Sequence, residues 1–267
     1  MIELQAESRR READDIVSFE LVDPAGELLS PFGAGAHIDV ETVDGQTRQY
    51  SLCDSPTDRH RYVIAALREG EGRGGSKWMH DSVQAGDTIR VGAPRNMFSL
   101  VGGAQHVILI AGGIGITPIL CMAEHLASAG RTFELHYCMR SMRRAAFVEK
   151  IRLSDYANRL TLYVSDDAST PTFEPRRVLG MPTAARHVYV CGPEGLMQRI
   201  VATASELGWR SAKVHRELFV RAPSATATHV TDAAFQGEPA SSGQIYDVPP
   251  GRTVVEVLAW YRRSDVL

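Results

Sequence analysis

The stretch HVILIAGGIGITPILCM, from His106 to Met122, decides the fold of this chain. It begins with an apolar run of strand length, continues through a turn rich in glycine, and enters a second apolar run at Pro118. Proline is well tolerated in the first turn of a helix, where its missing N–H is not needed. The stretch therefore predicts a buried strand, a glycine turn and the start of a helix. Its length and its glycines argue against a membrane span.

The chain beyond this stretch alternates between helix and strand patterns. The expected elements are a helix over 118–129, a strand over 133–139, a helix over 141–151, strands over 161–166 and 187–192, and a helix over 193–207. Alternation at this spacing is typical of a doubly wound α/β sheet with parallel strands. We therefore expect residues 104–221 to form an α/β domain.

The chain before this stretch carries short apolar runs that are separated by turn clusters. The expected strands cover 16–22, 36–40, 49–53, 62–67 and 87–91, and one short helix covers 76–83. Many short strands with turn signals between them favour an antiparallel barrel or sandwich. We expect residues 1–101 to form an antiparallel β-barrel domain.

Composition excludes several classes of protein. The 267 residues carry a formal net charge of −3, which gives no electrostatic footprint for nucleic acid or for an anionic membrane. The four cysteines, Cys53, Cys121, Cys138 and Cys191, form no CxxC pair and no disulfide framework, so a cytoplasmic location is expected. The amino-terminal residues are polar and charged and predict no signal peptide. No metal site is expected.

Arg48-Gln49-Tyr50-Ser51-Leu52 falls on a predicted barrel strand. Strand alternation puts Arg48, Tyr50 and Leu52 on one face, and Gln49 and Ser51 on the other. A guanidinium and an aromatic ring on one face suit a flat ring that carries a phosphate. The alternative interpretation is an ordinary strand with a half-buried tyrosine and an arginine that reaches the solvent.

Gly72-Arg73-Gly74-Gly75-Ser76 opens the short helix. Backbone N–H groups of a glycine-rich turn and of a helix start bind phosphate well, and Ser76 is a candidate N-cap. A plain β-turn followed by an ordinary capped helix fits the same residues.

Two further motifs follow predicted strands and precede helices. In Ala111–Pro118 the glycines allow a backbone to approach a pyrophosphate near a helix start, although Pro118 stands where the Rossmann fingerprint has its last glycine. Cys191-Gly192-Pro193 lies at the carboxyl end of another strand, the edge at which open α/β sheets bind ligands. The alternatives are a tight turn without a ligand and a small buried cysteine.

Together and in this order the motifs resemble the ferredoxin–NAD(P)H reductase-like superfamily, and most closely its phthalate dioxygenase reductase and vanillate O-demethylase reductase group. The resemblance extends over residues 5–258. It implies a flavoprotein that binds FMN in the barrel and NADH in the α/β domain. The matching segments are RQYSLCDSP (48–56), GRGGSKWMHD (72–81), APRNMFSL (93–100), LIAGGIGITPIL (109–120), HYCMRSMRRAAF (136–147), VYVCGPEGLM (188–197) and HRELF (215–219).

The resemblance also implies roles for residues of the flavin site. Arg48 would neutralise the FMN phosphate, Tyr50 would pack on the isoalloxazine ring, and Ser51 would lie near the redox edge of that ring. The GRGGS segment implies FMN rather than FAD. The other residues expected at the flavin are Leu52, Gly72, Gly74, Gly75 and Ser76.

On the nucleotide side the resemblance places Cys191 near the nicotinamide, and Phe219 over the flavin face until the nicotinamide displaces it. With Ser51, these two are the residues expected to take part in catalysis. Arginines after residue 139 suit the adenosine ribose of NADH and also a 2′-phosphate, and the resemblance favours NADH. The remaining residues expected at the dinucleotide are Gly113, Gly115, Thr117, Pro118, Arg140, Ser141, Gly192 and Pro193.

The implied chemistry belongs to the cofactors rather than to acid–base side chains. Hydride passes from nicotinamide C4 to flavin N5, and single electrons then pass to an oxygenase of the Rieske type (an aromatic dioxygenase or demethylase), directly or through a ferredoxin. Two other functions fit the same residues. One is a stand-alone flavin or ferric reductase with a diffusible acceptor, and the other is a subunit that binds flavin or nucleotide without turnover.

The carboxyl-terminal residues depart from the family pattern. Residues 222–242 have the composition of a linker, and residues 243–267 resemble only the strand, turn and helix that open a [2Fe-2S] ferredoxin domain. No cysteine follows Cys191, so no cluster ligands are expected. A partial sequence, a naturally shortened reductase and a shifted reading frame all fit this departure.

Overall fold

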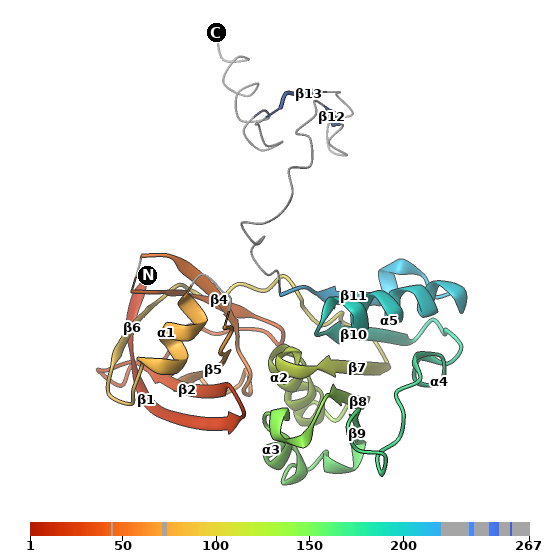
Figure 1. The fold of residues 1–267 in the computed structure, drawn as a ribbon, viewed down its shortest axis with the longest axis horizontal. Helices are drawn as coiled ribbons and strands as arrows, with labels where there is room; N and C mark the ends of the chain where they lie inside the picture. Colours follow the sequence, from red (N-terminus) through yellow and green to blue (C-terminus); the bar gives the residue numbers. More distant parts are fainter. Residues whose placement is uncertain (44, 71–73, 220–234, 238–245, 251–256, 258–267) are drawn as a thin grey trace. The chain divides into compact units, whose positions relative to one another are not determined.

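The computed structural model describes residues 1–43, 45–70, 74–219, 235–237, 246–250 and 257. Residues 1–220 form one compact unit, and residues 221–267 form another. The first unit contains a six-stranded sheet and a five-stranded sheet (Figure 1).

The six-stranded sheet is antiparallel and closes into a barrel. Its strand order is β4-β3-β6-β1-β2-β5. Beyond the end of β4, Leu52 forms a bridge with Ile64 of β5, and the Cys53 N–H donates to the Val63 carbonyl at 2.9 Å. These contacts join the two edge strands, and they confirm the predicted antiparallel barrel. The strands are β1 (Ile2–Ala13), β2 (Ile16–Val22), β3 (His37–Glu41), β4 (Thr47–Ser51), β5 (Arg61–Leu67) and β6 (Thr88–Val91).

Strand β1 is the longest of the barrel, with 12 residues, and the sequence prediction omitted it. Its pattern is mostly polar, and Arg9-Arg10-Arg11 lie near its carboxyl end. Only Leu4 and Ala6 are fully buried along it, and both pack in the barrel core. The strand is held between β2 and β6 by backbone pairing, which side-chain periodicity does not report.

The five-stranded sheet is parallel, as predicted, with the order β11-β10-β7-β8-β9. The chain begins at the central strand β7, extends the sheet to one side, and then returns to extend it on the other. The carboxyl ends of β7 and β10 therefore form the switch point at which such sheets bind ligands. The strands are β7 (His106–Gly112), β8 (Thr132–Met139), β9 (Leu160–Val164), β10 (Arg186–Cys191) and β11 (Val214–Glu217).

Alternate residues of β7 enter two different cores, which explains its continuous apolar run. Val107 and Leu109 pack in the cluster that contains residues of α2 (Ile116–Ser128) and α3 (Val148–Arg152). Ile108 and Ile110 pack in the cluster that contains residues of α4 (Pro175–Leu179) and α5 (Glu194–Glu206). The helices thus cover both faces of the sheet (Figure 1).

The helix predicted over 141–151 is wrong. A 3₁₀ turn (Met142–Arg144) comes first, and α3 begins only at Val148. Phe147 lies between them with a left-handed φ of 62° and is 5% exposed. A bulky residue adopts this conformation only where packing compensates for the strain. The apolar residues 145–147 are therefore a buried break before α3 rather than part of a helix face.

The barrel and the parallel sheet share one apolar core. Ile16, Val63 and Cys53 of the barrel pack in the same cluster as Leu120 of α2 and Ile151 of α3. This shared burial holds the two sheets of residues 1–220 together. The predicted boundaries at 101 and 104, and those of the linker, stay predictions.

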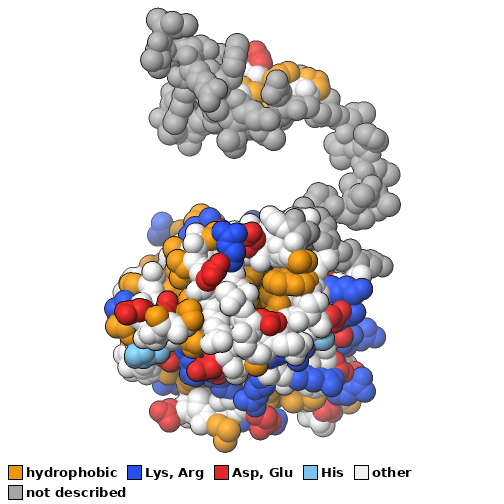
Figure 2. Space-filling view, turned by 90° about the vertical axis from the view of Figure 1, so that its left-hand side faces the viewer, with side chains coloured by type: hydrophobic (Ala, Val, Ile, Leu, Met, Phe, Trp, Pro, Cys, Tyr) orange, Lys and Arg blue, Asp and Glu red, His pale blue; other side chains and the backbone are white. Residues whose placement is uncertain are grey.

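The unit of residues 221–267 contains an antiparallel strand pair, β12 (Phe235–Gly237) with β13 (Tyr246–Val248), and β13 agrees with the strand expected there. The predicted helix of this region lies outside the described residues except for Val257. None of the helices in the described part of the chain has the length and apolar character needed to cross a bilayer. On the face of residues 1–219 seen in Figure 2, acidic and basic side chains are interspersed.

Two alanine substitutions on β1 test its place in the barrel. Leu4 is fully buried, whereas Ile2, on the same face of the strand, is 47% exposed. We expect Leu4→Ala to lower the free energy of unfolding in urea by about 2 to 5 kcal/mol. Ile2→Ala should cost less than about 1 kcal/mol. Equal losses would show that β1 does not contribute to the core as described.

Candidate functional site

The glycine turn after β7 packs backbone to backbone against the turn after β10. A β-carbon placed on Gly115 would lie 2.3 Å from the carbonyl oxygen of Cys191. One placed on Gly112 would lie 2.7 Å from Cδ of Pro193, and one placed on Gly192 would lie 2.8 Å from Cα of Gly112. Glycine is therefore required at these positions by close approach of two chain segments, whether or not a ligand is bound.

Gly113 lies in the same turn but has a different environment. Its φ is 54°, and a β-carbon there would meet no atom within 4 Å, so its outer side is open. The Tyr137 hydroxyl donates to the Gly113 carbonyl at 3.2 Å. The Thr117 hydroxyl donates to the Ile114 carbonyl at 3.0 Å, and Thr117 is 2% exposed. Pro118 lies in the first turn of α2, as predicted.

A cavity of about 720 Å³ opens at the carboxyl ends of the parallel strands. Arginine and aromatic side chains line it together with backbone of the glycine turn. Several of these residues were not anticipated from the sequence, although the rule that ligands bind at the carboxyl ends of such strands could have found them. The lining residues include Gly113, Arg140, Arg144, Tyr163, Phe173 and Pro193.

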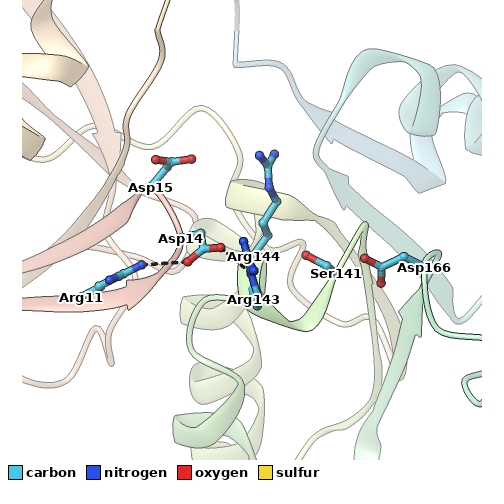
Figure 3. A pocket seen from close by; sticks show the side chains of 7 residues that line it. All are labelled: Arg11, Asp14, Asp15, Ser141, Arg143, Arg144 and Asp166. Carbon is cyan, nitrogen blue, oxygen red and sulfur yellow. Dashed lines mark hydrogen bonds and ion pairs between the residues drawn. The ribbon is translucent and has the colours of Figure 1, made fainter.

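Ser141 does not line this cavity. It lines a neighbouring pocket of about 530 Å³, which also reaches the β1–β2 hairpin (Figure 3). There Asp14 accepts a hydrogen bond from Arg143 Nε at 2.9 Å, and the Asp14 N–H donates to the Arg143 carbonyl at 2.7 Å. Arg143 is thus engaged by the barrel, whereas Arg140 and Arg144 face the larger cavity.

Cys191 ends β10 and is completely buried. Burial raises the pKa of its thiol well above the ordinary value, so the thiol stays protonated at neutral pH. The thiol is therefore not activated as a nucleophile.

Glu217 lies beside Cys191 on the neighbouring strand, and the sequence analysis gave it no role. Its Oε2 is buried and has no hydrogen-bond partner among the described residues. Burial raises its pKa to about 7. A buried carboxyl with a free acceptor at the ligand edge of the sheet is a candidate contact for a bound group. Phe219, two residues further on, is 43% exposed.

On the barrel, β4 arranges its side chains as the alternation predicted. Tyr50 and Leu52 pack in the barrel core, where they are 8% and 0% exposed. Burial raises the pKa of Tyr50 to about 12, so its hydroxyl stays neutral. Ser51 faces the other way and is also buried, opposite His37 in the β3–β4 ladder.

Arg48 lies against the start of α1 (Gly75–Asp81). A β-carbon on Gly75 would lie 2.9 Å from Cγ of Arg48, so glycine there makes room for the arginine. The predicted N-cap role of Ser76 is wrong. Gly74, with a φ of 88°, holds the cap position, and Ser76 accepts a hydrogen bond from the Glu69 N–H at 3.3 Å. Gly72 lies outside the described residues.

The structure thus gathers the predicted residues into two groups. Arg48 and Gly75 meet on the barrel, and the glycine turn meets Cys191, Gly192 and Pro193 on the parallel sheet. Strand β5, which pairs with Leu52, also contacts the Gly113–Gly115 turn. Strand β5 also contacts β4 and α1, which bear Arg48 and Gly75, so the two groups are connected through β5.

Comparison with known proteins agrees with this arrangement. The model of the dimethylamine monooxygenase subunit DmmA-like N-terminal domain matches residues 88–214. A vanillate O-demethylase oxidoreductase of Pseudomonas putida is 48% identical over 97% of this chain and 80% of its own length. Phthalate dioxygenase reductase of Burkholderia cepacia is 38% identical over 96% of this chain and 79% of its own length. A solved phthalate dioxygenase reductase superposes with a TM-score of 0.78 and 37% identity, covering 100% of this chain and 81% of that one.

The closed barrel and the parallel sheet with a cavity at its switch point define a reductase of the ferredoxin–NAD(P)H reductase type. The chain belongs to the family of phthalate dioxygenase reductases and vanillate O-demethylase reductases. It is an oxidoreductase of the flavoprotein class that serves as a component of oxygenase systems.

Two substitutions in the glycine turn separate the destabilisation caused by steric overlap from that caused by an unfavourable backbone conformation. Gly115→Ala forces a β-carbon onto the Cys191 carbonyl, and we expect it to lower the free energy of unfolding by about 3 kcal/mol. Gly113→Ala meets no neighbour and bears only the cost of a left-handed φ, about 1 to 2 kcal/mol. Urea unfolding of both variants checks this order, and a larger loss for Gly113→Ala would contradict it.

Glu217 should make stability depend on pH. Its folded-state pKa of about 7 exceeds its ordinary value of 4.5. The folded protein therefore retains a proton that the unfolded chain releases, and this contribution to stability is full below about pH 4.5 and lost as pH rises through about 7. Glutamine does not titrate. The stability of Glu217→Gln relative to wild type should hence increase from pH 4.5 to 7 and stay level above. A difference independent of pH would place this carboxyl in solvent.

Proposed function

We propose that the chain transfers electrons from NADH through FMN to an oxygenase of the Rieske type, directly or through a ferredoxin. The observation that carries this proposal is the contact between barrel strand β5 and the Gly113–Gly115 turn. Strand β5 also contacts β4 and α1, so it connects the elements that bear the two groups of candidate residues. Family membership supports the oxygenase as the acceptor.

The barrel residues fit a flavin phosphate. The guanidinium of Arg48 donates to the Thr47 carbonyl at 2.9 Å and to Gln46 Oε1 at 2.6 Å, and it pairs with no carboxylate among the described residues. Its positive charge is therefore left for an anion, next to the glycines that open α1. Arg48, Gly74 and Gly75 would hold the phosphate, and Tyr50 would support the ring.

The cavity at the strand ends fits a dinucleotide. It offers arginine side chains for phosphate, the open side of Gly113, and the aromatic pair Tyr163 and Phe173, whose ring centroids are 5.0 Å apart. NADH is favoured because Arg143, which is suited to a 2′-phosphate, is already paired with Asp14. Ser141 would contact the adenosine side from the neighbouring pocket, which Arg144 lines as well.

The chemistry supplied by these cofactors is acceptance of a hydride from nicotinamide by flavin and release of its electrons one at a time. The chain's own task is to align the two rings and to exclude water. Ser51 and Cys191 are buried and uncharged, so they would form fixed walls of the reacting region. Phe219, which is partly exposed, would cover the flavin until the nicotinamide arrives.

We also propose a cytoplasmic location, because all four cysteines are free thiols, three of them buried.

The proposal is tested with the full chain after reconstitution with FMN. The protein should be yellow, NADH should bleach it under anaerobic conditions, and candidate oxygenases or ferredoxins should then reoxidise it. A chain that does not retain FMN contradicts the flavin assignment. Rapid turnover with ferric or flavin acceptors alone would identify a stand-alone reductase. Binding of FMN without bleaching by NADH would identify a non-catalytic subunit.

Arg48→Ala should weaken the binding of FMN far more than the binding of NADH. Loss of charge-assisted hydrogen bonds of about 1.5 to 3 kcal/mol corresponds to a roughly 10- to 150-fold increase in the Kd for FMN. Arg90→Ala, on β6, removes an exposed arginine that pairs with Glu41 and serves as the matched control. Fluorescence titration of the apoprotein with FMN measures both. Equal changes in the two variants would show that Arg48 does not bind the phosphate.

A further inference from the structure

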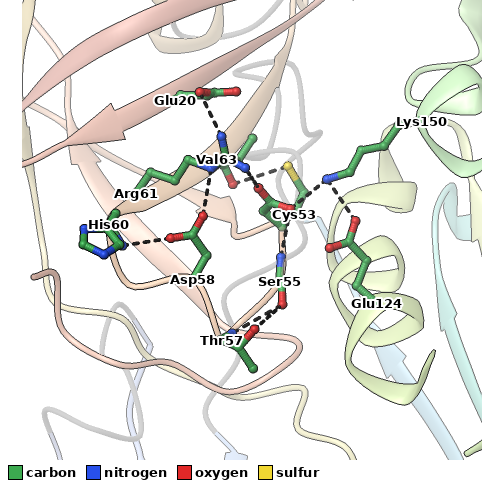
Figure 4. Close-up of polar contacts among 11 residues, drawn as sticks. Glu20, Cys53, Ser55, Thr57, Asp58, His60, Arg61, Val63, Glu124 and Lys150 are labelled. Carbon is green, nitrogen blue, oxygen red and sulfur yellow. Dashed lines mark hydrogen bonds and ion pairs between the residues drawn. The ribbon is translucent and has the colours of Figure 1, made fainter. Parts of the chain in front are cut away.

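Lys150 links the two sheets through a half-buried ion cluster, in which the side chains of Lys150 and Arg61 are each 38% exposed (Figure 4). It lies on α3, and its Nζ is 2.8 Å from Asp54 Oδ1 of the barrel and 2.9 Å from Glu124 Oε1 of α2. The side chains of Asp54 and Glu124 are only 11% and 15% exposed. Arg61 Nη2 approaches Asp54 Oδ2 at 3.1 Å and also pairs with Glu20 at 3.3 Å and with Asp58 at 3.2 Å. Two cations therefore face four carboxylates.

On the barrel side this cluster is joined rigidly to the proposed flavin strand. Asp54 follows Ser51 by three residues. Between them, the Leu52 N–H donates to the Ala36 carbonyl at 2.9 Å, and the Cys53 N–H donates to Val63 at 2.9 Å. Paired extended backbone of this kind does not bend freely. A displacement of Asp54 would therefore move the strand that carries Tyr50 and Ser51.

On the other side the cluster is joined to the proposed nucleotide turn. Glu124 lies within α2, the helix that begins directly after Gly113–Gly115. Nine residues of α2 are buried, so the helix moves as one body with its glycine turn. Lys150 is consequently the side chain that bonds to both rigid supports.

A second ion pair between the two sheets differs in character. Asp14 and Arg143 also join barrel and α/β region, but the Arg143 side chain is 86% exposed (Figure 3). Exposed pairs contribute little and tolerate rearrangement. In the Lys150 cluster the two carboxylates that Lys150 contacts are largely buried, so removal of the cation would leave their charge uncompensated.

We propose that Lys150 is a positioning residue for hydride transfer: by holding Asp54 and Glu124 it fixes the flavin strand relative to the nucleotide turn. This inference rests on the proposed function. Lys150 touches neither group of candidate site residues, so its loss should slow transfer within the loaded complex and leave the affinities for FMN and dinucleotide unchanged.

The experiment compares Lys150→Gln with Lys150→Arg and two controls in FMN-loaded protein. Arg152→Gln removes a neighbouring charge on α3 whose partner is the exposed Glu149, and Arg176→Gln removes an exposed ion pair between α4 and α5. Anaerobic stopped-flow at saturating NADH gives the rate of flavin reduction. Titration with NAD⁺, which does not reduce flavin, gives the dinucleotide Kd. Hydrogen–deuterium exchange of residues 52–55 and 116–124 reports the local stability of the two segments that Lys150 joins.

We expect Lys150→Gln to reduce flavin about tenfold more slowly, since small misplacement of reacting groups is costly. The Kd values for FMN and NAD⁺ should stay within about twofold of wild type, because no contact residue is changed. Exchange at both segments should rise, and Lys150→Arg should restore most of the rate. Both controls should match wild type.

An unchanged reduction rate in Lys150→Gln, or a loss that appears in Kd rather than in rate, overturns the inference. A wild-type protein that NADH does not reduce would instead refute the proposed function. If Lys150→Gln does not fold, Glu124→Gln replaces it, because it keeps the Lys150–Asp54 pair and removes the charged link to α2. A wild-type rate in that variant overturns the inference equally.

Discussion

The close contact between two turns of backbone governs the rest of this structure. Gly112 and Gly115 after β7, and Gly192 after β10, approach so closely that a β-carbon on any of them would collide with the other segment. The chain crosses from β7 to β8 on one side of this strand pair and from β10 to β11 on the other side. Because such crossovers are right-handed, α2 and α5 leave toward opposite faces of the sheet. The cavity proposed for the dinucleotide opens where these helices diverge, at the switch point of the sheet. The glycines serve the fold first, and ligand approach is a consequence.

The barrel is joined to this turn by two kinds of interaction. Apolar residues of both sheets share one core, which supplies most of the attraction but is tolerant of small shifts. The ion cluster around Lys150 is directional. Burial alone would lower the pKa of Lys150, but Asp54 and Glu124 together raise it, so the charged form is the one that the fold stabilises. Nonspecific burial thus holds the sheets together, and the ion cluster limits how they can be arranged.

How much the sequence predicts depends on whether local pattern or long-range contact decides a feature. The apolar run and glycine turn of β7 were predictable, because burial on both faces and a helix start leave local marks. Strand β1 was missed because backbone pairing, rather than a hydrophobic face, holds most of it. The prediction of a helix over 141–151 was wrong because packing turns Phe147 inward, and no local sequence pattern shows that packing. In the sequence, Lys150 and Glu217 resemble ordinary surface charges, because the residues that surround them in the fold come from distant parts of the chain.

The electrostatic character of the reacting region follows from the same packing. Tyr50 and Cys191 are buried and neutral, and Glu217 is largely protonated below pH 7. Arg48 and Arg140 carry the positive charge and lie where phosphates would bind. A region with neutral walls and charged ends suits chemistry that cofactors perform, since the walls need to align rings and exclude water rather than exchange protons. Burial alone creates this separation, because it raises each acidic pKa while leaving the arginines charged.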